Sequence, residues 1–301
     1  MNQEDIEKIL KAGEISVKVK NNAKKFIKKG LPLLDIAEKI EAEIIELGGK
    51  PGFPVNLDID EVAAHYTPSH DDSQVARGLL KVDIGVSVDG WVSDSAFSMD
   101  LEDNEENKKL IESTETAIEK IEKTLKSSPI GSVTTGQIGK ITHETAESFE
   151  FNPIINLSGH QIEQYDLHAG INIPNVDDNS LGKLSKGYYA IEPFITNGNG
   201  KIKDGAPSNI YLLISEKNVR NPNTREVLKY IIEEYQTLPF ASRWIVKKFG
   251  VRALLAIKQL ESNGNIHSYA QLIEVSGGKV AQTEHDFLIT DKEVIVTTKK
   301  N

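Results

Sequence analysis

Residues 81–97 read KVDIGVSVDGWVSDSAF, and this stretch decides the fold. Asp89-Gly90 strongly favours a two-residue hairpin loop, so the stretch predicts two antiparallel strands. In that register Gly85 lies opposite Asp94. Because strand residues alternate between faces, one face of the first strand is wholly apolar. Its members are Val82, Ile84, Val86 and Val88. The stretch therefore predicts a sheet with one face in the core and a second face that carries acids.

Two acids of this hairpin converge on the second face. Asp83 and Asp94 lie diagonal to one another, roughly 7–8 Å apart between backbones. Gly85 predicts an open space between the two carboxylates. Their repulsion is offset by a nearby positive charge, and a divalent cation is the simple candidate because hard cations prefer carboxylate oxygens. The hairpin alone also allows the plainer interpretation, in which both acids are ordinary polar residues on a solvated face.

Further candidate ligands follow in the second half of the chain. Glu192 lies in the apolar stretch YYAIEPF and Glu284 in KVAQTEHDFLI. We expect strands there, and a carboxylate in such a setting is costly unless it is paired or bound to metal. His160 and His168 lie close to glycines, and either one alone is typical of a structural histidine. Four carboxylates and one imidazole together suit a two-metal hydrolytic centre. These five residues are Asp83, Asp94, His160, Glu192 and Glu284.

Composition limits the class of protein. The chain has 301 residues, 39% of them hydrophobic and 27% charged, which is ordinary for a globular protein. A net charge of -10 argues against general nucleic-acid binding. Without cysteine there is no disulfide, zinc finger or cysteine nucleophile. No apolar run approaches the roughly 20 residues that cross a bilayer, and the N-terminus has no signal-peptide core. We therefore expect a cytoplasmic protein with no membrane partner and no specific nucleic-acid partner.

The hydrophobic periodicity predicts an α+β chain. We expect helices at 3–29, 33–47, 104–126 and 135–149, and strands at 79–99 and around 154–157, 171–173, 188–195 and 209–214. Residues 223–264 predict two or three helical segments, interrupted at Leu238-Pro239 and Gly250. Strands return at 267–275 and 279–297. The helical block is interpreted as an insertion into a sheet-forming domain.

Six stretches carry a specific resemblance to a known family. They are GFPVNLDIDEVAAHYTP (52–68), KVDIGVSVDGWVSDSA (81–96), INLSGHQIEQYDLHAG (155–170), AIEPF (190–194), TLPFASRW (237–244) and AQTEH (281–285). In these stretches the chain resembles the methionine aminopeptidases, and among them the type II group. The resemblance implies the pita-bread fold, a curved antiparallel sheet flanked by helices. It also implies a catalytic domain of residues 1–205 and 271–301, with an inserted winged-helix-like helical subdomain at 206–270.

The same resemblance assigns roles to individual residues. The implied metal ligands are Asp83, Asp94, His160, Glu192 and Glu284, with Asp94 and Glu284 bridging two ions. The implied catalytic residues are His65, His168 and Glu192. The implied methionine pocket is lined by Phe53, His65, Leu167, His168 and Tyr269. The family often has Phe where this chain has Thr283, whose side chain we expect to point away from Glu284.

The implied activity is removal of the initiator methionine from nascent proteins and peptides with a small second residue. Two divalent cations would activate the attacking water, and Co, Mn, Fe and Zn all accept such ligands. One alternative is an X-Pro aminopeptidase of the same fold, against which the stretch 237–244 and the long insertion argue. The other is a non-catalytic binding protein, against which the intact ligand set argues. We expect a monomer. A ribosome contact is a further hypothesis, beside the plainer interpretation of a solvated surface. It rests on a basic helical face of Arg243, Lys247, Lys248 and Arg252.

Overall fold

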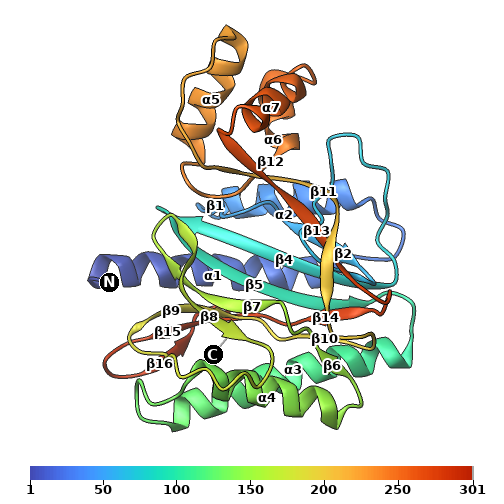
Figure 1. The fold of residues 1–301 in the computed structure, drawn as a ribbon, viewed down its shortest axis with the longest axis vertical. Helices are drawn as coiled ribbons and strands as arrows, with labels where there is room; N and C mark the ends of the chain where they lie inside the picture. Colours follow the sequence, from blue (N-terminus) through green and yellow to red (C-terminus); the bar gives the residue numbers. More distant parts are fainter. Residues whose placement is uncertain (300–301) are drawn as a thin grey trace.

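The computed structural model describes residues 1–299, and it confirms the predicted α+β class (Figure 1). The helices are α1 (Gln3–Phe26), α2 (Leu33–Glu46), α3 (Glu105–Ser127), α4 (Thr135–Ser148), α5 (Pro222–Glu234), α6 (Ser242–Phe249) and α7 (Ala253–Ser262). The strands of the first half are β1 (Lys50–Pro51), β2 (Asn56–Ile59), β3 (Val62–Ala64), β4 (Leu79–Val88) and β5 (Trp91–Asp100). The middle strands are β6 (Asn152–Pro153), β7 (Ser158–Glu163), β8 (Asp166–Pro174), β9 (Gly187–Ile191), β10 (Phe194–Thr196) and β11 (Ile202–Leu213). The last are β12 (Phe240–Ala241), β13 (Ile266–Glu274), β14 (Val280–Gln282), β15 (His285–Ile289) and β16 (Val294–Val296). Within residues 1–299, no helix combines the length and the apolar character that a membrane span requires.

Side-chain caps fix where the long helices begin. In α1, Asn2 Oδ1 accepts from the Asp5 amide at 3.0 Å, while the Asp5 carboxylate accepts from the Asn2 amide at 2.7 Å. Asn104 precedes α3, and its Oδ1 accepts from the amides of Glu106 and Asn107. These caps satisfy amides that have no partner inside the helix. The helices α1 to α4 all begin within one residue of the predicted positions, although α2, which follows Pro32, has no side-chain cap.

The hairpin β4–β5 has the predicted register, with Gly85 opposite Asp94. Val82, Ile84 and Val86 are fully buried in a core that they share with residues of α1 and α2. β4 also pairs with β1 and β2, which completes a four-stranded sheet. Because the apolar face packs on the helices, the acid-bearing face is turned toward the second half of the molecule, where β5 contacts β7 and β15.

The second half is built around a five-stranded antiparallel sheet with the strand order β16-β15-β9-β7-β8. It packs on α3 and α4 in a core that includes Ile121, Ile138, Tyr189 and Phe287. Figure 1 shows α3 and α4 together at the end of the molecule opposite α5, α6 and α7. The acids of the hairpin therefore lie where the two halves meet, and a further apolar cluster spans both halves there through residues such as Trp91 and Tyr188.

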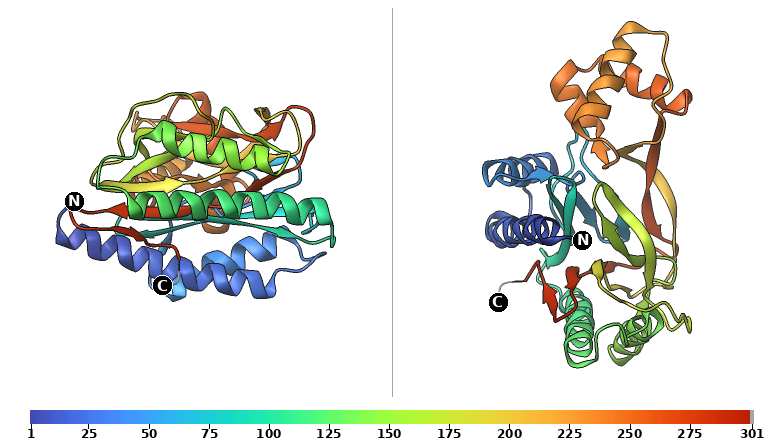
Figure 2. Two further views of the ribbon diagram at one scale, coloured as in Figure 1. Left: turned by 90° about the horizontal axis from the view of Figure 1, so that it is seen from below. Right: turned by 90° about the vertical axis from the view of Figure 1, so that its left-hand side faces the viewer.

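Helices α5, α6 and α7 form a group that extends beyond the rest of the molecule (Figure 2, right). They share a core with one another, which confirms helical segments interrupted at Leu238-Pro239 and Gly250. The long antiparallel pair β11 and β13 connects this group to the body. Both strands run through the expected limits at 205/206 and 270/271 without an end there. The subdomain limits therefore stay a prediction.

The expected basic helical face is wrong in two members. Arg252 lies beyond the end of α6, directly before α7. Arg243 is only 4% exposed, and its guanidinium pairs with Glu41 of α2. Lys247, Lys248 and Arg252 are exposed. Helical spacing alone could not show this difference, because a basic side chain near a helix end can point to solvent or to a buried acid on another element.

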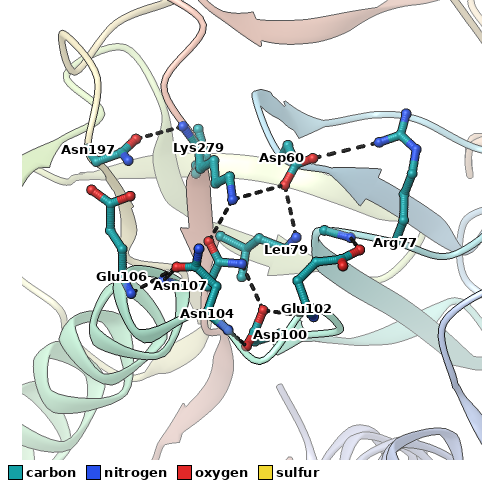
Figure 3. A network of polar contacts seen from close by, with 12 residues as sticks. Asp60, Arg77, Leu79, Asp100, Glu102, Asn104, Glu106, Asn107, Asn197 and Lys279 are labelled. Carbon is teal, nitrogen blue, oxygen red and sulfur yellow. Dashed lines mark hydrogen bonds and ion pairs between the residues drawn. The ribbon is translucent and has the colours of Figure 1, made fainter.

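A polar network joins four segments that are distant in the sequence (Figure 3). Lys279 Nζ donates to Asn107 Oδ1 at 2.9 Å and lies 3.8 Å from Asp60 Oδ1. Asn107 Nδ2 in turn donates to Asp100 Oδ1 at 2.7 Å, and the Lys279 amide donates to Asn197 Oδ1 at 2.7 Å. Because Asp100 ends β5 and Asn107 lies in the first turn of α3, the network fixes the direction in which α3 leaves the hairpin.

One predicted strand is wrong. Residues 154–157 form a turn between β6 and β7. The side chain of Asn156 holds this turn, because its amide donates to the Ile202 carbonyl at 2.9 Å and its Oδ1 accepts from the Ile202 amide at 2.9 Å. A side chain thus replaces the backbone ladder that the apolar sequence pattern suggested.

Candidate metal centre and adjoining pocket

Two interrupted strands lie side by side, and each interruption presents a glutamate. Glu192 and Pro193 separate β9 from β10, while Thr283 and Glu284 separate β14 from β15. β9 pairs with β15 and β10 pairs with β14, so the two gaps face each other. We expected both glutamates inside strands, and this is a correction. Pro193 has no N–H to donate, which prevents a continuous ladder at this point.

The predicted ligands converge at these gaps and on the hairpin. His160 Nε2 lies 3.6 Å from Asp94 Oδ2 and 3.8 Å from Glu192 Oε1. Ligand atoms of Asp94, His160 and Glu284 all lie within 4.8 Å of one another. Asp83 lies on β4, opposite Ala96. The structure therefore brings carboxylates from the hairpin, from both strand gaps and an imidazole from β7 to one place.

The polar atoms of this cluster are suited to a cation. Asp83 Oδ1, Asp94 Oδ1 and Glu284 Oε1 are buried and have no hydrogen-bond partner within residues 1–299. Buried carboxylate oxygens in this condition carry a large desolvation penalty. Carboxylate oxygens and imidazole nitrogen are also the donors that divalent transition metals accept. The residues present therefore fit a metal centre.

The electrostatics of the cluster follow from its burial. Burial raises the pKa of Asp83 to about 6. Burial, followed by repulsion from Glu284 and Asp83, raises the pKa of Asp94 well above its ordinary value. Burial and neighbouring carboxylates do the same to the pKa values of Glu192 and Glu284. Burial lowers the pKa of His160 to about 3, so the ring is neutral at physiological pH and can serve as a ligand.

A cavity of about 220 Å³ adjoins the cluster. Asp83, Asp94, His160 and Glu192 form its polar side. All five predicted pocket residues line it: Phe53, His65, Leu167, His168 and Tyr269. Sequence reasoning missed further apolar lining residues, which come from the turn at 154–157, from β10, β11 and β13, and from the segment before β12. These are Leu157, Phe194, Ile210, Pro239 and Leu272.

Two further histidines border the cavity. His65 has φ 69°, a left-handed conformation that is uncommon outside glycine. Its Nδ1 lies 3.2 Å from the Ala270 carbonyl, its ring meets Tyr269 edge-on, and burial lowers its pKa to about 4. His168 lies at the solvent-exposed rim with its ring centroid 4.5 Å from that of His160, and burial of the ring also lowers its pKa. Both rings are therefore neutral near pH 7.

The expectation of an open space above Gly85 is wrong. A Cβ on Gly85 would lie 2.4 Å from the nearest atom of the Phe53 ring, which is only 6% exposed. Phe53 thus packs directly against the glycine and lines the cavity beside the acids. The glycine is required for close approach of an aromatic ring.

Supporting residues behind the cluster were also missed. Asp286 Oδ2 accepts from the Asp94 amide at 2.7 Å and from the Tyr188 hydroxyl at 2.6 Å. Gln282 Nε2 donates to Glu192 Oε2 at 3.3 Å. Asp286 could have been noticed, because it follows Glu284 by two residues in an apolar strand. Thr283, as expected, turns away from Glu284 and meets Thr114 of α3 through a 2.8 Å hydrogen bond.

Comparison with known proteins agrees with this geometry. Residues 7–291 match the model of metallopeptidase family M24. The chain therefore belongs to metallopeptidase family M24. It is 41% identical to the methionine aminopeptidase of Pyrococcus horikoshii over 306 residues, which covers 98% of this chain and 100% of that relative. This full-length likeness places the chain with the methionine aminopeptidases of the family.

Solved structures confirm the predicted pita-bread fold. A thermophilic Arx1 has a TM-score of 0.84 at 15% identity, over 100% of this chain and 92% of that one. The methionine aminopeptidase of Thermotoga maritima has a TM-score of 0.71 at 21% identity, over 100% of this chain and 98% of that one. At these identities the likeness concerns the fold alone.

Proposed function

We propose that this chain is a metal-dependent exopeptidase that removes methionine from the N-terminus of proteins and peptides. The observation that carries the proposal is the cavity, in which an acid-rich polar side and a largely apolar lining enclose about 220 Å³. A half-open cavity of this kind accepts one unbranched apolar side chain while its peptide bond lies beside the acids. The full-length relatives named methionine aminopeptidase support the same activity.

The proposed centre holds two divalent cations. Asp83, Asp94, His160, Glu192 and Glu284 would hold them, and four carboxylates would balance two dications. Unpartnered oxygens on Asp83, Asp94 and Glu284 support this count. When bound, such ions lower the pKa of a water molecule and polarise the peptide carbonyl. Co, Mn, Fe and Zn are all compatible with this donor set.

Other steps of the reaction are assigned to individual side chains that line the cavity. Phe53, Leu167 and Tyr269 surround the methionine side chain and exclude water from it. Glu192, which borders the cavity beside the other acids, passes a proton of the attacking water to the leaving amine. A neutral His168 donates a hydrogen bond to the oxygen that develops negative charge. The confined mouth favours a small second residue in the substrate.

The rival activity is cleavage of X-Pro bonds on the same fold. The wall that the insertion supplies to the cavity, through Ile210 and Pro239, supports the methionine assignment. A hydrolysis assay distinguishes the methionine activity from the X-Pro activity. Its substrates are Met-Gly-Met, Leu-Gly-Met and Ala-Pro-Ala, and cleavage is measured by mass spectrometry after metal removal and readdition. We expect rapid metal-dependent cleavage of Met-Gly-Met only. Cleavage of Ala-Pro-Ala without action on Met-Gly-Met would establish the rival.

The wider setting remains part of the proposal. The substrates would be nascent chains in the cytoplasm, and the working form would be a monomer. A ribosome contact through Lys247, Lys248 and Arg252 stays a hypothesis. The ribosome contact is tested by pelleting the protein with ribosomes at low and at high salt, with alanine variants of these three residues for comparison. Contacts made by basic side chains weaken with salt.

A further inference from the structure

A closed ring of buried hydrogen bonds lies behind the wall of the cavity. Arg243 of α6 pairs with Glu41 Oε1 of α2, and that oxygen also accepts from the Val55 amide at 3.2 Å. The Val55 carbonyl accepts from the Thr67 hydroxyl at 2.7 Å. The Thr67 oxygen accepts in turn from Arg243 Nη1 at 2.6 Å, which closes the ring. Four residues from distant parts of the chain thus hold one another.

The ring is almost completely buried and is reinforced by further hydrogen bonds, although Glu41 and Arg243 also border a separate surface pocket. Thr67 and Val55 are 0% exposed, while Arg243 and Glu41 are 4% and 6% exposed. Arg243 Nη1 also donates to the Pro68 carbonyl at 3.1 Å, and Trp244 Nε1 donates to Glu41 Oε2 at 2.8 Å. Removal of one partner from a buried ion pair is strongly destabilising. Each member of the ring therefore restricts the positions of the others.

Three of the four members of the ring lie close in sequence to a wall of the cavity. Val55 lies two residues after Phe53, and Thr67 lies two residues after His65. Both Phe53 and His65 line the cavity. Arg243 lies four residues after Pro239, which is the part of the 237–244 stretch that reaches the cavity. No member of the ring is itself a lining residue among those described.

We propose that Arg243, Glu41 and Thr67 are positioning residues that set the width of the methionine pocket. The ring of hydrogen bonds fixes the distances between three lining residues of the cavity, Phe53, His65 and Pro239. The insertion thereby acts as a wall of the specificity pocket, joined to the body through Arg243. The inference rests on the proposed function, because it concerns which first residue the enzyme selects.

The sharpest test is a pair of substitutions at Thr67. Thr67→Val keeps the shape of the side chain and removes the hydroxyl, which leaves both Arg243 Nη1 and the Val55 carbonyl without this partner. Thr67→Ser keeps the hydroxyl. We expect the ratio of kcat/KM for Met-Gly-Met to that for Leu-Gly-Met to fall about tenfold in Thr67→Val. The loss arises mainly in KM, with metal content unchanged, and Thr67→Ser restores the ratio.

A matched control separates positioning from stability. Thr224, 2% exposed and inside the insertion, donates to Gln259 Oε1 away from the cavity. Thr224→Val removes a buried hydroxyl of the same kind, so it lowers Tm without changing the selectivity ratio. Hydrogen exchange read by mass spectrometry supplies a readout independent of activity. We expect faster exchange in residues 53–68 for Thr67→Val, and in residues 221–262 for Thr224→Val.

The outcomes distinguish the two proposals. Suppose that the wild-type enzyme cleaves Met-Gly-Met, and that Thr67→Val changes neither the selectivity ratio nor the hydrogen exchange. The proposal that the ring positions the pocket is then overturned, while the proposed function stands. Equal loss of selectivity in Thr224→Val also overturns the positioning proposal, because a general loss of stability then explains the effect. Failure of the metal-loaded wild-type enzyme to cleave Met-Gly-Met overturns the proposed function, while the exchange experiment still judges the ring.

Discussion

At the scale of single residues, the cluster is defined by charge that the chain does not neutralise by itself. Asp94 is surrounded by Glu284 and Asp83, and repulsion adds to burial in raising its pKa. A carboxyl group with a raised pKa destabilises the fold once the pH is high enough to ionise it. The same residue that would bind metal is therefore a liability in the metal-free protein.

The first prediction concerns Asp94→Asn. We expect kcat for Met-Gly-Met to fall by more than about 100-fold, with less metal retained in elemental analysis. At pH 8 the metal-free variant should melt roughly 2 °C or more above metal-free wild type, because Asn removes a carboxyl group whose raised pKa costs stability at that pH. Asp89→Asn on the exposed turn is the control, and it should leave kcat, metal content and Tm unchanged. Near-normal kcat with full metal occupancy in Asp94→Asn would remove Asp94 from the centre.

The second prediction concerns pH and metal affinity. In the metal-free fold the pKa of Asp83 is about 6, and those of Asp94, Glu192 and Glu284 are also raised by burial. These groups hold protons that a metal must displace, so affinity rises with pH. His160 does not compete, since its pKa is about 3.

Titration calorimetry of Co²⁺ binding between pH 5.5 and 8, in two buffers of different ionisation enthalpy, measures the protons released. We expect more than one proton per protein, and hence a loss of more than about tenfold in affinity per pH unit at the acid end. Release of a single proton around pH 6.5 would instead identify a histidine as the competing group.

At the scale of secondary-structure elements, the sequence predicted local pairing well and contacts across elements poorly. The register of β4–β5 followed from a turn dipeptide and alternating faces, both of which are local. The ring of Phe53 over Gly85 and the pairing of Arg243 with Glu41 were missed, because each depends on packing between segments far apart in the chain. Family resemblance supplied the candidate ligand set, but not the strand gaps that present Glu192 and Glu284.

The third prediction tests the contact between the hairpin and the segment that carries Phe53. Gly85→Ala places a methyl group 2.4 Å from the Phe53 ring, which must tilt into the cavity. We expect KM for Met-Gly-Met to rise about tenfold, with metal content unchanged. Gly182→Ala, whose methyl group would first meet Thr135 Oγ1 at 3.3 Å, is the control. An unaltered KM in Gly85→Ala would mean that Phe53 does not shape the pocket.

At the scale of the whole molecule, the candidate centre lies where the two halves meet. Asp83 and Asp94 belong to the hairpin that packs on α1 and α2, whereas His160, Glu192 and Glu284 belong to strands of the second half and the gaps between them. The acids repel one another across this boundary when no cation is present. A bound metal would therefore add a crosslink between two halves that also share apolar packing.

The fourth prediction follows from this arrangement. A ligand that binds only the folded state stabilises it by about 2.7 kcal/mol at 100 times its Kd. For a chain of this size that corresponds to a Tm about 5 °C higher, measured by calorimetry with saturating Co²⁺ or with chelator. Asp94→Asn should lose this dependence, whereas Thr224→Val should melt lower in both conditions and keep the full difference. Elemental analysis must first show that metal is bound in the loaded wild type. If the loaded and the chelator-treated wild type then have the same Tm, the ions do not hold the halves together.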